Sequence, residues 1–180
     1  MSLVPTITVQ GLAAVFNSHH NGLEVAISEV ALGNQADDSV AVNSNGLATQ
    51  TALVAEQQRV PIADGQRVSP QQIDLSFVAD GSSSYWVHEL GFYLADGTLF
   101  AVWSDPDQAL AWKSDRVPLV VGMELVLSAL PADSVTVQSS GAPLQLMMTR
   151  EIAAMANALA RLQLEQLRQA QQIKRITGVY

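Results

Sequence analysis

Residues 85–106, YWVHELGFYLADGTLFAVWSDP, constrain the fold of this chain more than any other stretch. Aromatic and aliphatic residues alternate with their neighbours along two runs that flank Asp96-Gly97, a dipeptide that tolerates the positive φ angles of a tight hairpin turn. The pattern therefore predicts a β-hairpin. Because its strands carry most of the aromatic side chains of the chain, we expect the hairpin to form the centre of the core, with Trp86, Phe92 and Trp103 buried.

Similar period-2 patterns before and after the hairpin predict further strands, at residues 23–32, 73–77, 119–130 and 135–137. Ahead of them, Thr8 is placed to cap a helix that runs to about His20, where Asn21-Gly22 would end it. Residues 105–117 are expected to form a loop. These elements indicate an N-terminal helix packed on an antiparallel, β-sandwich-like domain.

The apolar pattern changes period in the C-terminal part of the chain. Residues 144–177 contain no Gly or Pro, and about four heptads place the a and d positions at alternating steps of three and four. The predicted core positions are Ile152, Met155, Leu159, Leu162, Gln166, Gln169, Ile173 and Ile176. A helix of this length would extend roughly 50 Å, at about 1.5 Å per residue, which is too long for the flank of a small domain. The two glutamines would cost stability in the seam but can fix register or chain number.

The sequence thus predicts an α+β fold in two parts. Residues 1–142 form the globular domain, and residues 143–180 form a long C-terminal coiled-coil helix that joins copies of the chain into an oligomer. No run of apolar residues is long enough for a transmembrane helix, and the N-terminus lacks the pattern of a signal peptide. The absence of cysteine excludes disulfides and thiolate metal sites.

Charge divides along the same boundary. Residues 1–142 hold 15 acidic residues and 4 Lys or Arg, whereas residues 143–180 hold 2 acidic residues and 5 Lys or Arg. The acidic body disfavours nucleic acid and anionic membranes as partners. The basic charges of the tail are interleaved with apolar residues, which is typical of a solvated coiled-coil face rather than a nucleic-acid helix.

The candidate catalytic residues have simpler explanations. Adjacent His19 and His20 on a helix would point about 100° apart and could not share a metal. His88 and Glu89 on a strand would face opposite sides, which favours a packed or interface histidine. No nucleophile motif, phosphate-binding loop or Ca²⁺ loop is present. We therefore expect no enzyme activity and no catalytic, cofactor-binding or metal-binding residues.

The aromatic side chains raise the question of a binding surface. A sugar-stacking platform is an alternative to core packing for these residues. Trp112, in the expected loop between Asp107 and Asp115, is the aromatic residue that we predict to lie on a partner surface.

Four sequence words resemble, in order and spacing, the N-terminal domain of phage tail-collar fibre proteins. They are ITVQGLAAVFNSHHNGLEVAISEVALGN (7–34), RVPIADGQRVSPQQI (59–73), ELGFYLADGTLFAVWSDP (89–106) and LVLSALPADSVTV (125–137). The resemblance implies a structural protein of a virion, or of a related contractile particle, that attaches a trimeric fibre to the phage tail or baseplate. It also implies assembly in the bacterial host cytoplasm.

The resemblance also suggests the partners. They are two further copies of the chain in a trimer, a baseplate or tail protein, and a distal fibre protein. Because fibres of this kind usually continue much further, we expect either a truncated fibre or a separate adaptor. Two alternatives stay open: a carbohydrate- or receptor-binding module, favoured by exposed aromatics beside Asp and Asn on loops, and a small enzyme, favoured by a deep pocket that holds His88 with a carboxylate.

Overall fold

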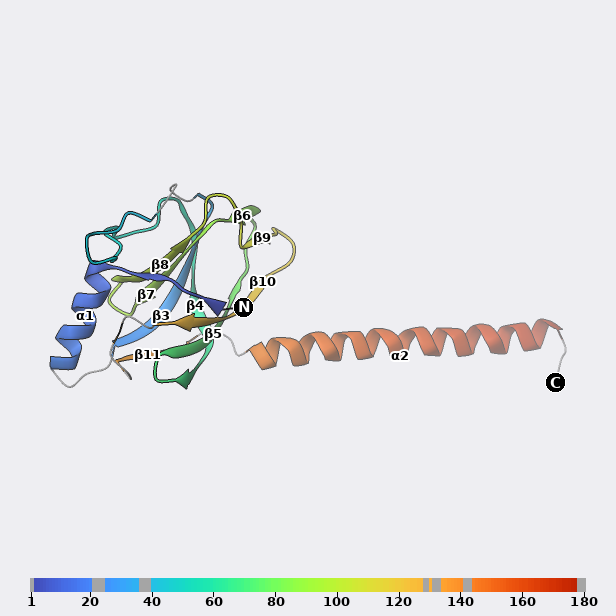
Figure 1. Ribbon diagram of the computed structural model, residues 1–180. Coiled ribbons are helices and arrows are strands. Elements are labelled where there is room, and N and C mark those ends of the chain that lie inside the picture. Colours follow the sequence, from blue (N-terminus) through green and yellow to red (C-terminus); the bar gives the residue numbers. More distant parts are fainter. Residues whose placement is uncertain are drawn as a thin grey trace. The chain divides into compact units, whose positions relative to one another are not determined.

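The computed structural model describes residues 2–20, 25–35, 40–127, 130, 134–140 and 144–177 (Figure 1). The chain divides into two compact units, Met1–Gly141 and Ala142–Tyr180. The first is rich in β-structure, and the second contains one helix.

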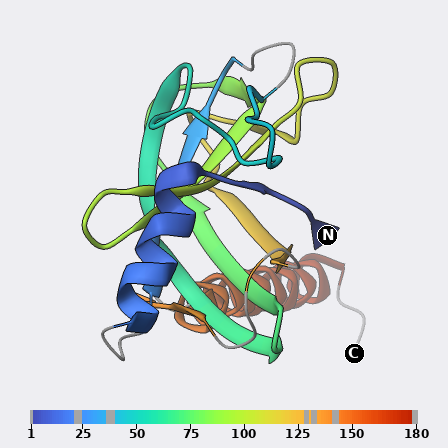
Figure 2. The ribbon, with the colours of Figure 1, turned by 60° about the vertical axis from the view of Figure 1, so that its left-hand side comes forward.

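The first helix begins where the sequence predicts. In α1 (Val9–His20), the hydroxyl of Thr8 accepts a hydrogen bond from the Gly11 amide at 2.8 Å, which is the geometry of an N-cap. The same hydroxyl donates to the carbonyl oxygen of Leu99, so the cap also ties the helix to the β-sheet. A side chain at Gly11 would collide with the backbone of Phe100, so α1 can lie close against the sheet only with glycine there (Figure 2). The predicted stop at Asn21-Gly22 lies outside the described residues.

Among the described residues of the first unit, nine strands form one hydrogen-bonded sheet. The path through the sheet is β1-β10-β5-β4-β3-β7-β8-β2, and β11 pairs with β3 beside this path. The pairs are antiparallel except for β1 with β10 and β11 with β3. The strand bounds are β1 (Ser2–Leu3), β2 (Thr6–Ile7), β3 (Val25–Gly33), β4 (Glu56–Ser69), β5 (Gln72–Ala79), β7 (Glu89–Leu94), β8 (Leu99–Ser104), β10 (Leu119–Val126) and β11 (Val135–Val137).

The sheet curves because its longest strand changes partner. The first half of β4 pairs with β3, and the half after Pro61 pairs with β5. β11 takes the place that β4 leaves free beside the start of β3, and Val137 packs where Gly65 has no side chain. At the ends of the path, β1 pairs with β10 and β2 with β8, although only two residues separate β1 from β2. The result is a half-barrel made of one continuous sheet, where the sequence predicted a sandwich-like pair of layers.

The central hairpin is confirmed. Strands β7 and β8 pair around a turn in which Gly97 has a φ of 84° and the Asp96 carboxylate accepts the Thr98 amide at 2.9 Å. All six residues of β7 are buried. Large, fully buried side chains come from this hairpin and also from the more distant strands β5 and β10: Phe77, Leu90, Phe92, Leu99, Phe100 and Leu125.

The expectation that Trp86 belongs to this core is wrong. Phe92 is fully buried and Trp103 is partly buried against the core, but Trp86 is 53% exposed. The chain leaves the hairpin at His88, and β6 (Tyr85–Val87) pairs instead with β9 (Ala111–Lys113) in a separate two-stranded sheet. Residues 105–117 therefore contain a strand and are not only a loop.

The remaining strand predictions differ mainly at their boundaries. Along β5 the side chains of Ile73, Leu75 and Phe77 are buried and those between them are less so, as the alternation predicts. β10 ends at Val126, four residues before the predicted end.

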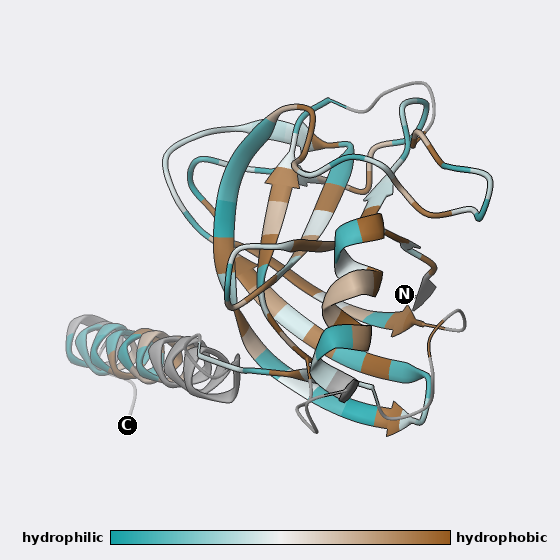
Figure 3. Cartoon of the chain, turned by 90° about the vertical axis from the view of Figure 1, so that its left-hand side faces the viewer, coloured by the Kyte–Doolittle hydropathy of each residue, from teal (hydrophilic) through white to brown (hydrophobic). Residues whose placement is uncertain are grey.

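The described part of the second unit forms one helix, α2 (Leu144–Thr177), of 34 residues (Figure 1). The long C-terminal helix is thus confirmed, whereas the coiled coil, which the described residues of this single chain do not show, stays a prediction. Apolar and polar residues are interspersed along its described part (Figure 3). Among the described residues, no helix combines the length and apolar character needed to span a membrane.

Candidate interaction surfaces

Trp86 and Trp112 form an exposed aromatic pair on the β6–β9 ribbon. The antiparallel register places the two residues directly opposite each other. Their ring centroids are 5.0 Å apart, and the ring planes are tilted by 58°. Trp112 is 47% exposed, close to the value for Trp86. Half-exposed tryptophans in direct contact are uncommon on a free surface and typical of an interaction site.

The other face of the ribbon is anchored to the domain by buried groups. Lys113 is fully buried, and its ammonium group donates hydrogen bonds to the carbonyl oxygens of Gly81 and Ser83, the latter at 3.1 Å. Burial raises the pKa of Tyr85, whose hydroxyl donates to the side-chain oxygen of Gln58 at 3.4 Å. The Gln58 amide donates in turn to the Asp80 carbonyl at 2.5 Å. These hydrogen bonds attach the ribbon to the turn at residues 80–84, on the face opposite the two tryptophans.

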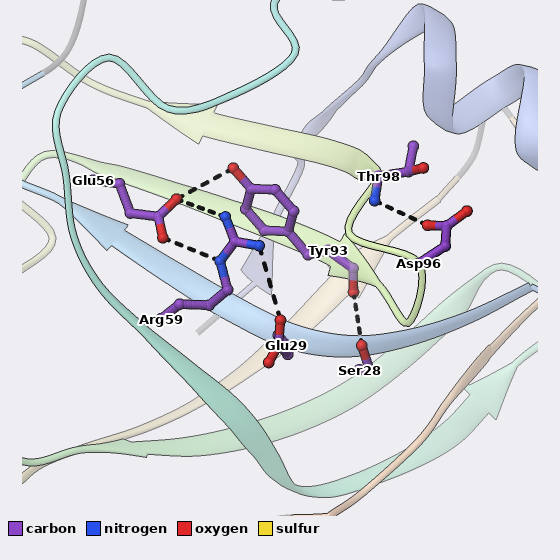
Figure 4. A network of polar contacts seen from close by, with 7 residues as sticks. All are labelled: Ser28, Glu29, Glu56, Arg59, Tyr93, Asp96 and Thr98. Carbon is purple, nitrogen blue, oxygen red and sulfur yellow. Dashed lines mark hydrogen bonds and ion pairs between the residues drawn. The ribbon is translucent and has the colours of Figure 1, made fainter.

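A second polar network lies across β3, β4 and β7 (Figure 4). The Arg59 guanidinium stacks over the Tyr93 ring at 3.6 Å and makes two hydrogen bonds to Glu56, at 3.1 and 2.8 Å. Glu29 lies 3.9 Å from the same guanidinium. The bond to Glu56 raises the pKa of Arg59, while burial and then the Glu56 carboxylate raise the pKa of Tyr93. The network joins three strands, and its two carboxylates and the Tyr93 ring are the partners of the Arg59 guanidinium.

Most of the few basic groups of the first unit are engaged in this way. Arg59 is paired, Arg67 donates to the Val135 carbonyl at 2.6 Å, and Lys113 is buried. Arg116 is exposed. The acidic residues far outnumber these groups, so the solvent-facing charge of the unit is negative.

His88 and Glu89, which the sequence offers as candidate catalytic groups, contact backbone groups of the domain. The Glu89 side chain is fully buried, and its two oxygens accept the amides of Val54 at 3.0 Å and Ala55 at 2.7 Å. The His88 ring nitrogen Nδ1 lies 3.0 Å from the Asp105 carbonyl oxygen. Within the described residues, no three His, Cys, Asp or Glu side chains lie close enough to hold a metal ion. An open hollow on β4, β5 and β10 has Asp64, Asp74 and Glu124 among its lining residues, and His88 does not line it.

The predicted oligomerisation positions of α2 are exposed wherever their side chains are described. Met155, Leu159 and Leu162 are 65%, 60% and 60% exposed, and Gln166 and Gln169 are exposed as well. The side chains of Ile152, Ile173 and Ile176 lie outside the description. Leu164 and Leu167 are also exposed, at 56% and 62%, but they lie outside the predicted seam.

Sequence reasoning found Trp112 but missed its partner. The sequence pattern places Trp86 in the hairpin because the alternation runs through His88 without a break. The available signal was the pair of short words SSSYWV and LAWKSD, each with one tryptophan between turn-forming residues. Only the register shows that the two words pair with each other.

These observations define a curved, mostly antiparallel β-domain with an exposed tryptophan pair, followed by a helix that exposes a row of apolar residues. The chain belongs to the family described as phage tail-collar fibre protein, N-terminal, which matches residues 1–153. The family indicates a structural role in a phage tail fibre, and therefore a component of the virion. The chain has no match among curated proteins or among solved structures.

Proposed function

We propose that this protein attaches a trimeric fibre to the phage tail or baseplate. In this proposal the β-domain, residues 1–142, docks on a baseplate or tail protein through a surface that includes Trp112. The helical segment, residues 143–180, joins three copies and leads to a distal fibre protein. The proposal assigns no catalytic step, cofactor, nucleic acid or membrane to the chain, and it places assembly in the host cytoplasm.

The exposed seam of α2 is the observation that carries this proposal. Full burial of a leucine or methionine side chain stabilises an assembly by about 1.5–3 kcal/mol relative to exposure. In the single chain Met155, Leu159 and Leu162 are each at least 60% exposed, so most of this stabilisation is available only when another chain buries them. A coiled coil of three chains is proposed because the resembled fibres are trimeric, and isoleucine at both a and d positions is compatible with that number.

The oligomerisation half of the proposal is tested in the full chain with Leu159→Asp and Leu162→Asp together. Unpaired charges in the seam should convert the trimer to a monomer in light scattering. Leu164→Asp is the matched control, because Leu164 is comparably exposed but lies outside the seam. If the control dissociates as fully as the double variant, or if the double variant remains a trimer, the seam is not the interface.

The docking half is tested with Trp112→Ala. We expect the variant to fold and form trimers but to be lost from purified particles, because an exposed aromatic anchor is removed without disturbing the core. Normal incorporation would place the attachment surface elsewhere.

A carbohydrate- or receptor-binding module is the second candidate function. It is favoured by the clustering of Trp86 and Trp112 beside Asp115, which is hydrogen-bonded to Ser84 at 3.1 Å. In that case Trp112→Ala should leave incorporation intact and reduce adsorption of the assembled particle to host cells.

A further inference from the structure

We propose that Trp86 and Trp112 act together as a recognition notch for arginine-type side chains of the protein on which the β-domain docks. This inference rests on the proposed attachment function and adds the chemistry of the partner. It follows from the shape of the pair, from the way the ribbon is held, and from the charge around it.

The shape of the pair disfavours a flat stacking surface. Ring planes tilted by 58° at a centroid distance of 5.0 Å cannot present one continuous plane to an extended sugar chain. They can receive a small planar group, which stacks on one indole while its edge lies against the other. A guanidinium has this size and flatness, and it stacks on aromatic faces.

The ribbon holds the pair ready for binding. The buried Lys113 side chain, on the other face of the ribbon, donates hydrogen bonds to two backbone carbonyls. Near the end of the ribbon, the Ser84 hydroxyl accepts a hydrogen bond from the Asp115 amide at 2.9 Å and donates one to the Asp115 carboxylate. Binding to such a preorganised pair costs little ordering entropy. The ammonium group of Lys113 is engaged with the turn and is therefore not available to stack on the indole rings.

The surrounding charge selects a cation rather than an anion. The Asp115 carboxylate lies at the end of the ribbon, two residues beyond Lys113, and is exposed. Arg116, next to Asp115, is exposed as well, but the first unit as a whole carries a large excess of acidic residues, and Arg59 and Arg67 have internal partners. Electrostatic attraction would therefore bring a basic surface to this domain, and the tryptophan faces would bind its guanidinium groups.

The experiment uses the full chain and acetyl-triarginine amide as the probe. The chain has three tryptophans, so nuclear magnetic resonance should show three indole N–H signals that single substitutions assign. We expect saturable shifts of the Trp86 and Trp112 signals and none at Trp103, which packs against the core. Acetyl-tricitrulline amide, which is planar but uncharged, should bind at least about fivefold more weakly.

Two substitutions separate the notch from general charge attraction. Trp86→Leu and Trp112→Leu keep apolar area but remove one aromatic face, and each should weaken triarginine binding about threefold or more at the remaining signal. Equal binding by tricitrulline, or unchanged binding in both leucine variants, would overturn the inference. So would chitotriose shifting the two signals where triarginine does not.

The outcomes also separate this inference from the proposed function. If Trp112→Ala is lost from particles while triarginine leaves both indole signals unmoved, the attachment surface stands and the arginine-type partner is wrong. If triarginine binds the notch but Trp112→Ala enters particles normally, the notch does bind arginine-type groups. The claim that it binds the protein on which the β-domain docks is then refuted.

Discussion

Replacing Glu89 by glutamine should destabilise the β-domain far more than the same change at an exposed carboxylate. The Glu89 side chain is fully buried at the start of β7, and its two oxygens accept the amides of Val54 and Ala55 at 3.0 and 2.7 Å. These bonds close the loop that leads from β3 to β4. Glutamine has nearly the same shape, but one of the two acceptors becomes an NH₂ group facing an N–H donor.

The expected loss follows from the two bonds. A hydrogen bond to a charged group contributes about 1.5–3 kcal/mol, and leaving a buried donor without an acceptor costs about 1–3 kcal/mol. Because Val54 is about half exposed, at 47%, water can replace part of what is lost there. We therefore expect Glu89→Gln to lower the free energy of unfolding by about 2–4 kcal/mol.

Urea unfolding at pH 7, followed by tryptophan fluorescence, measures this difference. Glu56→Gln is the matched control. Glu56, like Glu89, accepts two hydrogen bonds, but they come from the Arg59 side chain and lie on the surface, where such pairs contribute about 0–1 kcal/mol. A loss for Glu89→Gln no larger than that for Glu56→Gln would refute the reasoning.

A second variant checks the same site by sterics. A Cβ atom at Gly33 would lie 2.1 Å from the nearer Glu89 oxygen, so Gly33→Ala should be strongly destabilising. The penalty should be much smaller in a Glu89→Ala background, because the colliding atoms are gone. Additive losses in the double variant would show that the two residues do not meet.

Two further outcomes are expected. Phe92→Ala should cost about 3–5 kcal/mol because the ring is fully buried, whereas Trp86→Ala should cost about half as much or less in the same urea assay; equal losses would contradict the assigned exposures. Burial raises the pKa of Tyr93, so its contribution is complete below the unfolded value of about 10 and is lost as pH rises toward the folded value. Tyr93→Phe should therefore flatten the decline of stability above pH 10, and an unchanged alkaline slope would refute this.

Several elements followed from the sequence alone because short-range physics specifies them. The Asp96-Gly97 turn, the cap at Thr8 and the uninterrupted helix α2 depend on residues within a few positions of one another. The alternation along β5 likewise reports that one face of the strand is buried. The spacing of the α2 seam could also be predicted, although its role in assembly remains a proposal.

The tertiary structure alone decided what lies around these elements. Local pattern does not reveal that β4 changes partner, that the N-terminal strands reach both ends of the sheet path, or that β6 leaves the hairpin for β9. The burial of charged Glu89 and Lys113 likewise depends on backbone groups that lie about 30 residues away in sequence. Alternation specifies which residues share a face of a strand, but only long-range pairing specifies what covers that face. For that reason the sequence shows both tryptophans and their flanking turn residues, but only the tertiary structure shows that the two residues pair.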